Sequence, residues 1–266
     1  MWFLKLAIIV VVAYACVVAA IYALQTRMLF PARLVTARSA LPPSAIQLEI
    51  KTPDGETLVG VHISPERSAP NPVLILGFGG NAWHGNDVAS HLHGLYPEAG
   101  IIAFQYRGYA PSTGDPSAKA LLADAVTVFD QVQRTMGTRP TVAVGFSIGS
   151  GVAAHLASQR TLAGLILVSP FDSLEALARE HYPWAPVGWL LRHRMSTIDA
   201  VRGLAMPTAI IAAERDTVVP PARTEAVRKA VSWLVLDHTV PTADHNSLYE
   251  LAPFRAAMVA ALDRLK

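Results

Sequence analysis

The segment Gly145-Phe146-Ser147-Ile148-Gly149 constrains the fold of this chain more than any other stretch. An apolar, strand-like run at residues 141–144 precedes it, and a helix-like run at residues 150–159 follows it. A serine between a strand and a helix sits on a strained turn that pushes its Oγ out at the end of a sheet. The flanking glycines avoid clashes with the neighbouring strand and helix. The pattern predicts a nucleophilic Ser147, and the alternative is a Gly/Ser-rich turn that serves packing alone.

Strand-like and helix-like segments alternate along most of the chain. Residues 46–51 and 57–63 flank Pro53-Asp54-Gly55, which predicts an antiparallel hairpin. Continuously apolar runs, typical of parallel strands buried on both faces, lie at residues 73–76, 101–104, 142–144, 165–168, 208–212 and 233–236. Amphipathic segments lie at residues 87–96, 117–134, 150–159, 222–230 and 247–265. This rhythm predicts an α/β fold with a mostly parallel, doubly wound sheet and helices on both faces.

Residues 6–24 form an uncharged apolar run between Lys5 and Arg27. As a helix the run is about 28 Å long at ~1.5 Å per residue, which is close to the thickness of a bilayer core. We therefore predict a single-pass membrane anchor. The alternative is a cleaved signal peptide, whose apolar region is usually only ~7–15 residues long. Cys16 after Ala15 resembles a lipoprotein cleavage site only faintly.

The predicted organisation is an anchor at residues 1–25, a linker at 26–44 and one domain at 45–266. Arginines after the run outnumber Lys5 before it, which favours a cytoplasmic domain only weakly, so the membrane face stays open.

The charge and the cysteine content limit which binding partners and which cross-links are possible. The net charge is only +2, and no dense Lys/Arg run is interleaved with aromatic residues, so we expect no nucleic-acid partner. Arg192-His193-Arg194 is the most basic short stretch and fits a solvated helix face or a position near lipid head groups. A lone cysteine allows no intramolecular disulfide and does not identify the redox compartment. The oligomeric state stays open.

A nucleophilic serine needs a base, and the base needs an acid that orients it. Asp216 follows the strand-like run at 208–212, and His245 follows the last strand-like run. Both therefore fall at the carboxyl edge of the sheet, where Ser147 also lies. We predict that Ser147, His245 and Asp216 form a catalytic triad.

Other acids and histidines compete for these roles. Asp172 also follows a strand-like run, and it fits either a helix N-cap or the acid of the triad. His238 ends the last strand-like run and fits a packed or exposed position. Glu214 and Asp244 are expected to serve their own loops.

The glycine-rich loop Gly77-Phe78-Gly79-Gly80-Asn81-Ala82 follows the third predicted strand. Glycines let a backbone approach a developing negative charge, so we predict an oxyanion hole built from the backbone N–H groups of Asn81 and Ile148. The Asn81 side chain and Trp83 are candidates for lining the pocket or for stabilising the loop.

The same loop also fits a dinucleotide-binding fingerprint, with Arg107 placed to receive a 2′-phosphate. An NADP-dependent oxidoreductase is therefore the remote alternative, although it leaves the placement of the predicted triad unexplained. His91 and His93 lack the i, i+4 spacing of a helical metal pair. We expect no metal and no organic cofactor.

These residues, together with Gln105-Tyr106-Arg107-Gly108-Tyr109, Ser112-Thr113-Gly114 and Ser169-Pro170-Phe171, resemble the α/β-hydrolase superfamily. The match is similar to its membrane-anchored branch, which includes protein depalmitoylases, and it covers roughly residue 46 to the C-terminus. Gly79-Gly80 stands where that family usually has His-Gly.

The resemblance implies a small cap at about residues 172–206. Its aromatic residues Tyr182, Trp184 and Trp189 fit either an apolar substrate pocket or the packing of the cap on the sheet. The expected activity is hydrolysis of an ester or thioester bond through an acyl-enzyme, with a small-molecule or lipid acyl substrate. An amide- or peptide-cleaving hydrolase and a catalytically silent membrane-tethered scaffold remain the alternatives.

Overall fold

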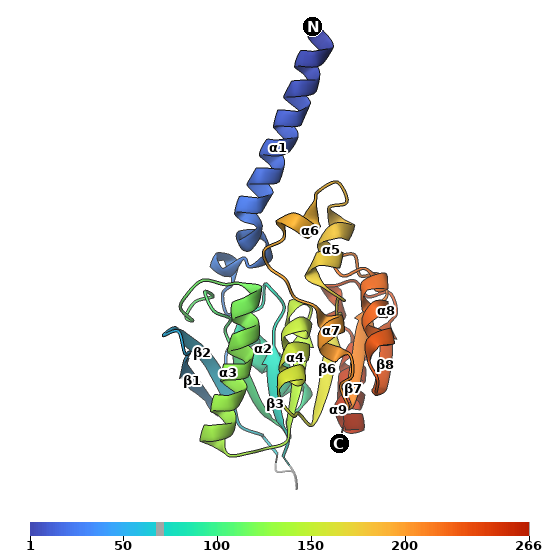
Figure 1. The fold of residues 1–266 in the computed structure, drawn as a ribbon. Helices are drawn as coiled ribbons and strands as arrows, with labels where there is room; N and C mark the ends of the chain where they lie inside the picture. The colour runs from blue at the N-terminus through green and yellow to red at the C-terminus, as the bar shows by residue number, and fades with distance from the viewer. Residues whose placement is uncertain (68–71, 266) are drawn as a thin grey trace.

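The structure, a computed structural model, describes residues 1–67 and 72–265. Its centre is an eight-stranded sheet with the order β1-β2-β4-β3-β5-β6-β7-β8 (Figure 1). The strands are β1 (Ala45–Lys51), β2 (Thr57–Ile63), β3 (Leu74–Phe78), β4 (Gly100–Phe104), β5 (Thr141–Phe146), β6 (Gly164–Val168), β7 (Thr208–Ala213) and β8 (Leu234–Val240). β2 pairs antiparallel with β1 and β4, and the other neighbours are parallel. The predicted hairpin and parallel sheet are confirmed.

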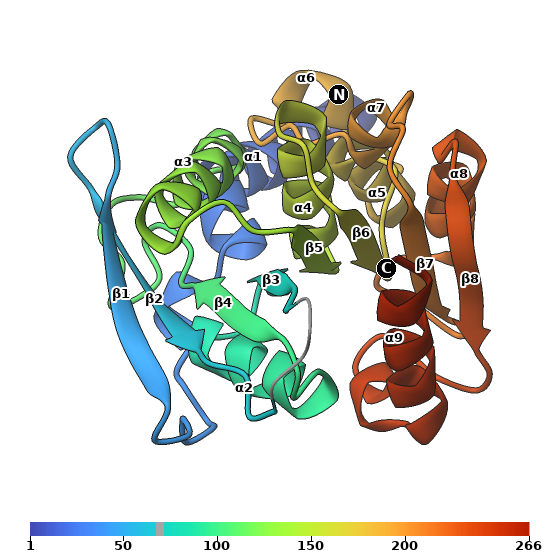
Figure 2. The same cartoon turned by 90° about the horizontal axis from the view of Figure 1, so that it is seen from below.

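Helices cover both faces of the sheet, as the view along it shows (Figure 2). One layer contains α3 (Ala118–Met136), α4 (Ile148–Gln159) and α8 (Pro221–Ala230), and the other contains α2 (Gly85–Leu95) and α9 (Ala252–Leu265). A short 3₁₀ turn, η2 (Ser247–Glu250), precedes α9. Successive residues of β3 enter opposite cores, with Leu74 and Leu76 facing the α3/α4 layer and Ile75 facing the α2/α9 layer. Burial on both faces explains why these strands are continuously apolar.

The segment expected to form a cap leaves the sheet between β6 and β7. It contains three short helices, α5 (Leu174–His181), α6 (Val187–Leu190) and α7 (Thr197–Val201). Of these, α5 and α6 rise beyond the carboxyl edge of the sheet, and α7 packs against α4 and α8 (Figure 1). This arrangement places the cap on the side of the molecule where the strands end.

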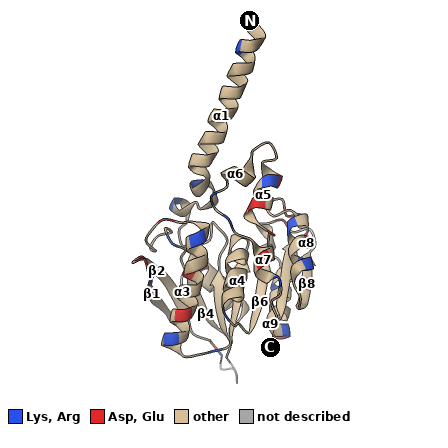
Figure 3. Ribbon diagram, viewed as in Figure 1, with Lys and Arg blue, Asp and Glu red and all other residues tan. Residues whose placement is uncertain are grey.

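The N-terminal helix α1 (Trp2–Leu29) projects from the same side of the molecule (Figure 1). The helix carries no charged residue between Lys5 and Arg27, and this stretch is tan in the view coloured by charge (Figure 3). Among the described helices it alone is long and apolar enough to cross a membrane, with a mean hydropathy of 2.7, although a signal sequence would meet the same criteria. The helix continues four residues beyond the predicted end of the anchor at residue 25.

The chain after α1 packs against the rest of the molecule. Phe30 and Val35, on either side of the 3₁₀ turn η1 (Ala32–Leu34), are buried in the core. The backbone N–H groups of Arg38 and Ser39 both donate to the carboxylate of Asp87 on α2. These contacts hold the base of α1 beside the sheet.

Candidate active site

Ser147 occupies a strained turn between β5 and α4. Its φ of 51° and ψ of −117° place a non-glycine residue in a backbone region that costs about 1–3 kcal/mol. Hydrogen bonds hold this conformation, because the Ser147 N–H donates to the Val168 carbonyl at 2.9 Å and its carbonyl accepts from the Ser150 N–H at 2.9 Å. The turn leaves Ser147 half-buried at the end of β5, at the carboxyl edge of the sheet.

The two glycines of the turn are required by close backbone approaches. A Cβ on Gly145 would overlap the carbonyl oxygen of Gly149 and lie 2.6 Å from the Ser150 Cα. A Cβ on Gly149 would overlap the Phe78 carbonyl oxygen and lie 2.6 Å from that of Gly79. The start of α4 therefore lies directly against the end of β3.

Asp216 and His245 come from the loops that follow β7 and β8. His245 Nδ1 lies 2.7 Å from Asp216 Oδ2, and His245 Nε2 lies 3.1 Å from Ser147 Oγ. Asp216 Oδ1 accepts the backbone N–H groups of Val218 at 3.0 Å and Val219 at 2.7 Å, so both carboxylate oxygens are engaged. Asp216 and His245 are 4% and 9% exposed, so little water competes for these bonds.

The carboxylate determines which nitrogen of His245 carries the proton. An ionised aspartate only accepts hydrogen bonds, so Nδ1 of a neutral His245 donates to it. Nε2 is then left with a lone pair directed at the Ser147 hydroxyl. The structure thus brings together all three residues of the predicted triad in a geometry that suits proton transfer from the serine.

The competing acid and histidine take no part in the hydrogen bonds that join Ser147, His245 and Asp216. Asp172 accepts from Arg223 Nη1 at 2.9 Å and from the Ser173 N–H at 2.7 Å. His238 lies on β8, and its Nε2 is buried without a hydrogen-bond partner among the described residues.

Two further acids bond to loop backbone groups. Glu214, in the loop after β7, accepts the Thr242 N–H of the loop after β8 at 2.8 Å, so it joins two loops and does not serve its own loop as expected. Asp244 accepts the N–H groups of Asn246 and Ser247, each at 2.9 Å.

The glycine-rich loop lies beside the serine. A Cβ on Gly80 would be 3.8 Å from the Ser147 Cβ. Within the described chain, neither the Asn81 N–H nor the Ile148 N–H donates a hydrogen bond. Ile148 is also the first residue of α4, where the helix dipole favours negative charge. Both groups are therefore available to an oxyanion.

Tyr106 and Tyr109 hold this loop through hydrogen bonds to its backbone carbonyls, a role that was not predicted from the sequence. The Tyr106 hydroxyl donates to the Gly79 carbonyl at 2.8 Å, and the Tyr109 hydroxyl donates to the Asn81 carbonyl at 3.1 Å. Burial raises the pKa of both tyrosines, which keeps their hydroxyls protonated as donors. Their place in the Gln105–Tyr109 motif was the only signal in the sequence.

The side chains of Asn81 and Trp83, which were candidates for lining the pocket, make contacts with other parts of the protein. The Asn81 side chain turns toward α1, where its Nδ2 donates to the Leu29 carbonyl at 3.3 Å. Trp83 packs behind the site, with its ring centroid 4.7 Å from that of Tyr249 and 5.1 Å from that of Phe146. Burial, and secondarily the charge of Asp216, raises the pKa of Tyr249.

Arg107, the residue placed to receive the 2′-phosphate of a dinucleotide, is bound to carboxylates instead. Arg107 is 9% exposed and donates to Asp124 Oδ2 through Nε at 3.0 Å and to Asp124 Oδ1 through Nη2 at 2.6 Å. Nη2 also donates to Asp54 Oδ1 at 3.0 Å. The guanidinium is therefore committed to two carboxylates and is not free to bind a phosphate.

The two histidines of α2 contact different residues and do not face a common site. His93 Nε2 lies 3.0 Å from Glu66 Oε1, whereas His91 packs against Phe254. Within residues 1–67 and 72–265, no group of three or more His, Cys, Asp or Glu side chains has the arrangement of a metal site.

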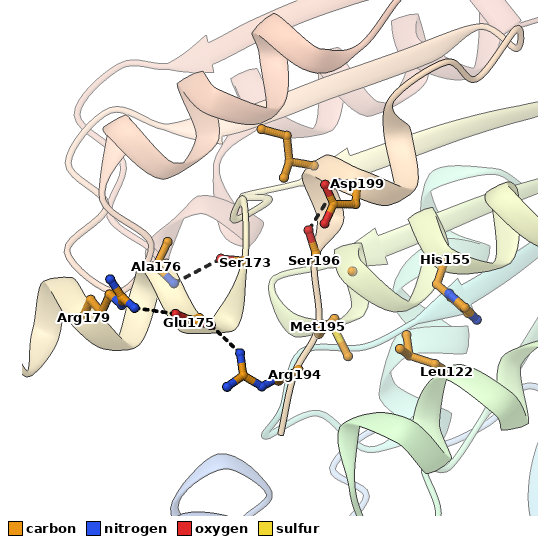
Figure 4. A pocket seen from close by; sticks show the side chains of 12 residues that line it. Leu122, His155, Ser173, Glu175, Ala176, Arg179, Arg194, Met195, Ser196 and Asp199 are labelled. Carbon is orange, nitrogen blue, oxygen red and sulfur yellow. Dashed lines mark hydrogen bonds and ion pairs between the residues drawn. The ribbon is translucent and has the colours of Figure 1, made fainter. Parts of the chain in front are cut away.

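Pockets lie beside the cap. One, of about 660 Å³, lies between α4 and the cap, and none of the three predicted triad residues lines it (Figure 4). Its charges are paired, because Glu175 accepts from both Arg179 and Arg194 at 2.6 Å. Another, of about 200 Å³, is apolar and lies between α1 and the cap.

Comparison with known proteins identifies the class to which this fold and site belong. Residues 71–190 match the alpha/beta hydrolase fold family. An uncharacterized protein of Mycobacterium tuberculosis is 32% identical over 245 residues, which cover 90% of this chain and 86% of that protein. The chain therefore belongs to the α/β-hydrolase superfamily.

Other relatives carry functional names. Lysophosphatidylserine lipase ABHD12 of Danio rerio is 29% identical over 56% of this chain, and that of Mus musculus is 30% identical over 57%. The matched region spans only 44% of either lipase. Membership of the superfamily and these lipase relatives support hydrolase activity.

Solved structures share the fold at low sequence identity. The Pyrococcus furiosus esterase aligns with a TM-score of 0.66 at 16% identity, over 87% of this chain and 97% of that one. An alpha-beta serine hydrolase homologue from Coxiella burnetii aligns with a TM-score of 0.64 at 18% identity, over 85% of this chain and 100% of that one.

Proposed function

We propose that this protein is a membrane-anchored serine hydrolase that cleaves the ester or thioester bond of an acyl substrate. One observation carries the proposal: a hydrogen-bonded chain runs from Ser147 Oγ through His245 to Asp216, and the serine is held at a positive φ. An adjacent base within hydrogen-bond reach, itself oriented by an acid, is the arrangement that activates a serine.

The reaction would proceed through an acyl-enzyme. His245 Nε2 takes the Ser147 proton as Oγ attacks the substrate carbonyl, and the Ile148 and Asn81 N–H groups stabilise the resulting oxyanion. The tetrahedral intermediate collapses, and His245 returns the proton to the departing oxygen or sulfur. A water then gives a proton to His245 and attacks the acyl carbon. His245 returns this proton to Ser147 Oγ as the bond between the acyl carbon and Oγ breaks, which releases the acid and restores Ser147. Asp216 stabilises the imidazolium throughout.

The contacts of α1 favour a retained anchor over a cleaved signal sequence. Gln25 is 7% exposed, its Nε2 donates to the Leu190 carbonyl at 3.0 Å, and its Oε1 accepts the Arg192 N–H at 2.8 Å. Thr26 Oγ1 lies 2.7 Å from His193 Nε2. Loss of the helix through Thr26 would leave these cap groups without partners, and cleavage before Cys16 would remove the Tyr14 hydroxyl that donates to the Trp184 carbonyl at 3.0 Å. An anchor beside the site, together with the lipase relatives, supports a lipid-like acyl substrate.

The test is labelling of the full-length chain in detergent with a fluorophosphonate probe, beside Ser147→Ala, His245→Ala and the control Ser158→Ala. Ser158 is an exposed serine at the end of α4 and should not affect labelling. We expect the parent and Ser158→Ala to label, Ser147→Ala to stay unlabelled, and His245→Ala to label far more weakly. Turnover of esters, thioesters and amides by the parent would then rank the bond types.

A folded parent that does not label would contradict the proposal and favour the tethered scaffold. Labelling that persists in Ser147→Ala would place the nucleophile elsewhere.

A further inference from the structure

We propose that the tip of the cap, residues 182–191, inserts into the same membrane leaflet that holds α1, so that the protein meets the bilayer through two elements. The inference rests on the proposed anchoring by α1 but not on the chemistry of Ser147.

The cap tip is apolar and exposed. Its ten residues, Tyr-Pro-Trp-Ala-Pro-Val-Gly-Trp-Leu-Leu, include no charged side chain. Trp189 is 92% exposed, Trp184 48% and Tyr182 38%. Clustered exposed aromatic residues mark contact surfaces, and tryptophan and tyrosine are enriched where a protein meets a membrane interface.

Hydrogen bonds hold the cap tip against α1. The Tyr14 hydroxyl donates to the Trp184 carbonyl at 3.0 Å, and Gln25 Nε2 donates to the Leu190 carbonyl at 3.0 Å. Tyr14 makes its bond through the end of a long side chain, and the cap tip itself lies beside the lower half of α1 (Figure 1).

The cap tip lies where the apolar part of α1 ends. The uncharged run at residues 6–24 is about 28 Å long, against a hydrocarbon core of about 30 Å, so a bilayer that covers this run extends down into the lower half of α1. The top of the cap rises beside that part of the helix, so it would enter the same leaflet (Figure 1).

The backbone of the cap tip is suited to an apolar medium. Unpaired N–H and C=O groups are costly in hydrocarbon. Pro183 and Pro186 carry no N–H, and six other tip residues donate theirs to backbone carbonyls within α5 or the tip, namely Tyr182, Ala185, Val187, Trp189, Leu190 and Leu191. The bonds from Tyr14 and Gln25 satisfy two of the carbonyls.

Arginines mark the level at which the membrane would end. Arg192 follows the cap tip directly, stacks 5.5 Å over the Tyr22 ring and donates from Nη2 to Thr26 Oγ1 at 3.1 Å. Arg27 and Arg33 are exposed at the base of α1. Basic side chains at the ends of a membrane segment lie near lipid phosphates.

The apolar pocket of about 200 Å³ opens between these two elements. It is lined by Ile21, Met28 and Leu29 of α1 and by Val187, Leu190 and Leu191 of the cap. Leu29 also accepts the hydrogen bond from the Asn81 side chain, so the pocket ends next to the predicted oxyanion loop. An acyl chain of a lipid in the same leaflet fits this position, because it would reach the pocket without crossing water.

Depth-dependent quenching tests the insertion. The full chain is placed in phosphatidylcholine/phosphatidylglycerol vesicles that contain lipids spin-labelled midway along an acyl chain. A nitrobenzoxadiazole dye is attached in turn to the native Cys16, to Trp184→Cys and to Trp233→Cys, the last two in a Cys16→Ser background. Trp233 is 54% exposed and precedes β8, at the sheet edge opposite the site, so it is the matched aqueous control.

We expect strong quenching and a blue-shifted emission at Cys16 and at Trp184→Cys, and neither at Trp233→Cys. Quenching at Cys16 without quenching at Trp184→Cys would overturn the inserted cap tip while leaving the anchor intact. Quenching at neither position would show that α1 itself does not span, which defeats the anchoring on which the inference rests.

A kinetic comparison separates the inference from the proposed chemistry. For Trp184→Glu, the ratio of kcat/KM toward a long-chain ester embedded in vesicles to that toward a short-chain soluble ester should fall about tenfold, because a carboxylate is costly in hydrocarbon. Trp233→Glu should keep the parent ratio. A parent ratio in Trp184→Glu would count against insertion, whereas an inactive parent would count against the hydrolase and leave the quenching result valid.

Discussion

At the scale of single residues, hydrogen bonding separates two aspartates that the sequence places at neighbouring strand ends. Asp216 bonds to His245 Nδ1 at 2.7 Å and accepts the Val219 N–H at 2.7 Å. Asp172 forms an ion pair with Arg223 at 2.9 Å. Only the first aspartate is placed to select the tautomer of the histidine.

Asp216→Asn should therefore lower kcat by roughly 10⁴-fold, as the same exchange does in a serine-protease triad. The amide no longer requires a proton on His245 Nδ1, so the ring can hold its proton on Nε2, where it cannot accept the proton of Ser147. Asp172→Asn should leave kcat within about tenfold of the parent, because it touches no reacting group. Steady-state hydrolysis of a soluble ester by both folded variants measures the difference. A larger loss in Asp172→Asn would reverse the assignment of the acid.

At the scale of elements, the contact between α4 and β3 depends on one missing side chain. A Cβ on Gly149 would meet the carbonyl oxygens of Phe78 and Gly79, which are backbone atoms. Gly149→Ala should thus lower the free energy of unfolding by about 1–3 kcal/mol, a typical cost of overpacking. It should also reduce turnover, because the loop that carries Asn81 must move.

Gly94→Ala is the matched control for this change. Gly94 lies exposed within α2, and a Cβ there would meet nothing within 4 Å. The substitution should stabilise the protein by about 0.4–1 kcal/mol, chiefly by restricting the unfolded chain. Urea unfolding in detergent measures both variants. Equal stability of the two would mean that the start of α4 has room that the structure does not show.

Local patterns in the sequence predict the strands and the residues at their ends, but they do not predict contacts between distant segments. Strand positions could be predicted because burial on both faces makes strands such as β6 and β7 continuously apolar. The strand ends then placed Ser147, Asp216 and His245 on one edge, and their catalytic roles remain a proposal. The bond from Tyr14 to Trp184 joins residues 170 positions apart, and no local pattern encodes such a contact.

At the scale of the whole molecule, burial couples the protonation of His91 to folding. Burial, and secondarily the charge of Arg255, lowers the pKa of His91 from 6.5 to about 4. Among the described residues, its Nε2 is buried without a hydrogen-bond partner. The ring lies between aromatic side chains, 5.5 Å from Trp83 and 6.0 Å from Phe254. An imidazolium there would lack both water and a counter-ion.

Folding stability should consequently fall as the pH is lowered from 6.5 to 4. In that window the unfolded chain binds a proton at His91 and the folded chain does not, so acidification favours unfolding by about 3 kcal/mol at pH 4. Burial also lowers the pKa of His62, His155 and His193, which adds a loss of the same sign. His91→Phe should therefore flatten the dependence of Tm on pH without abolishing it. Thermal unfolding of parent and variant between pH 4 and 7 measures this, and an unchanged loss in the variant would show that His91 is already protonated in the folded protein.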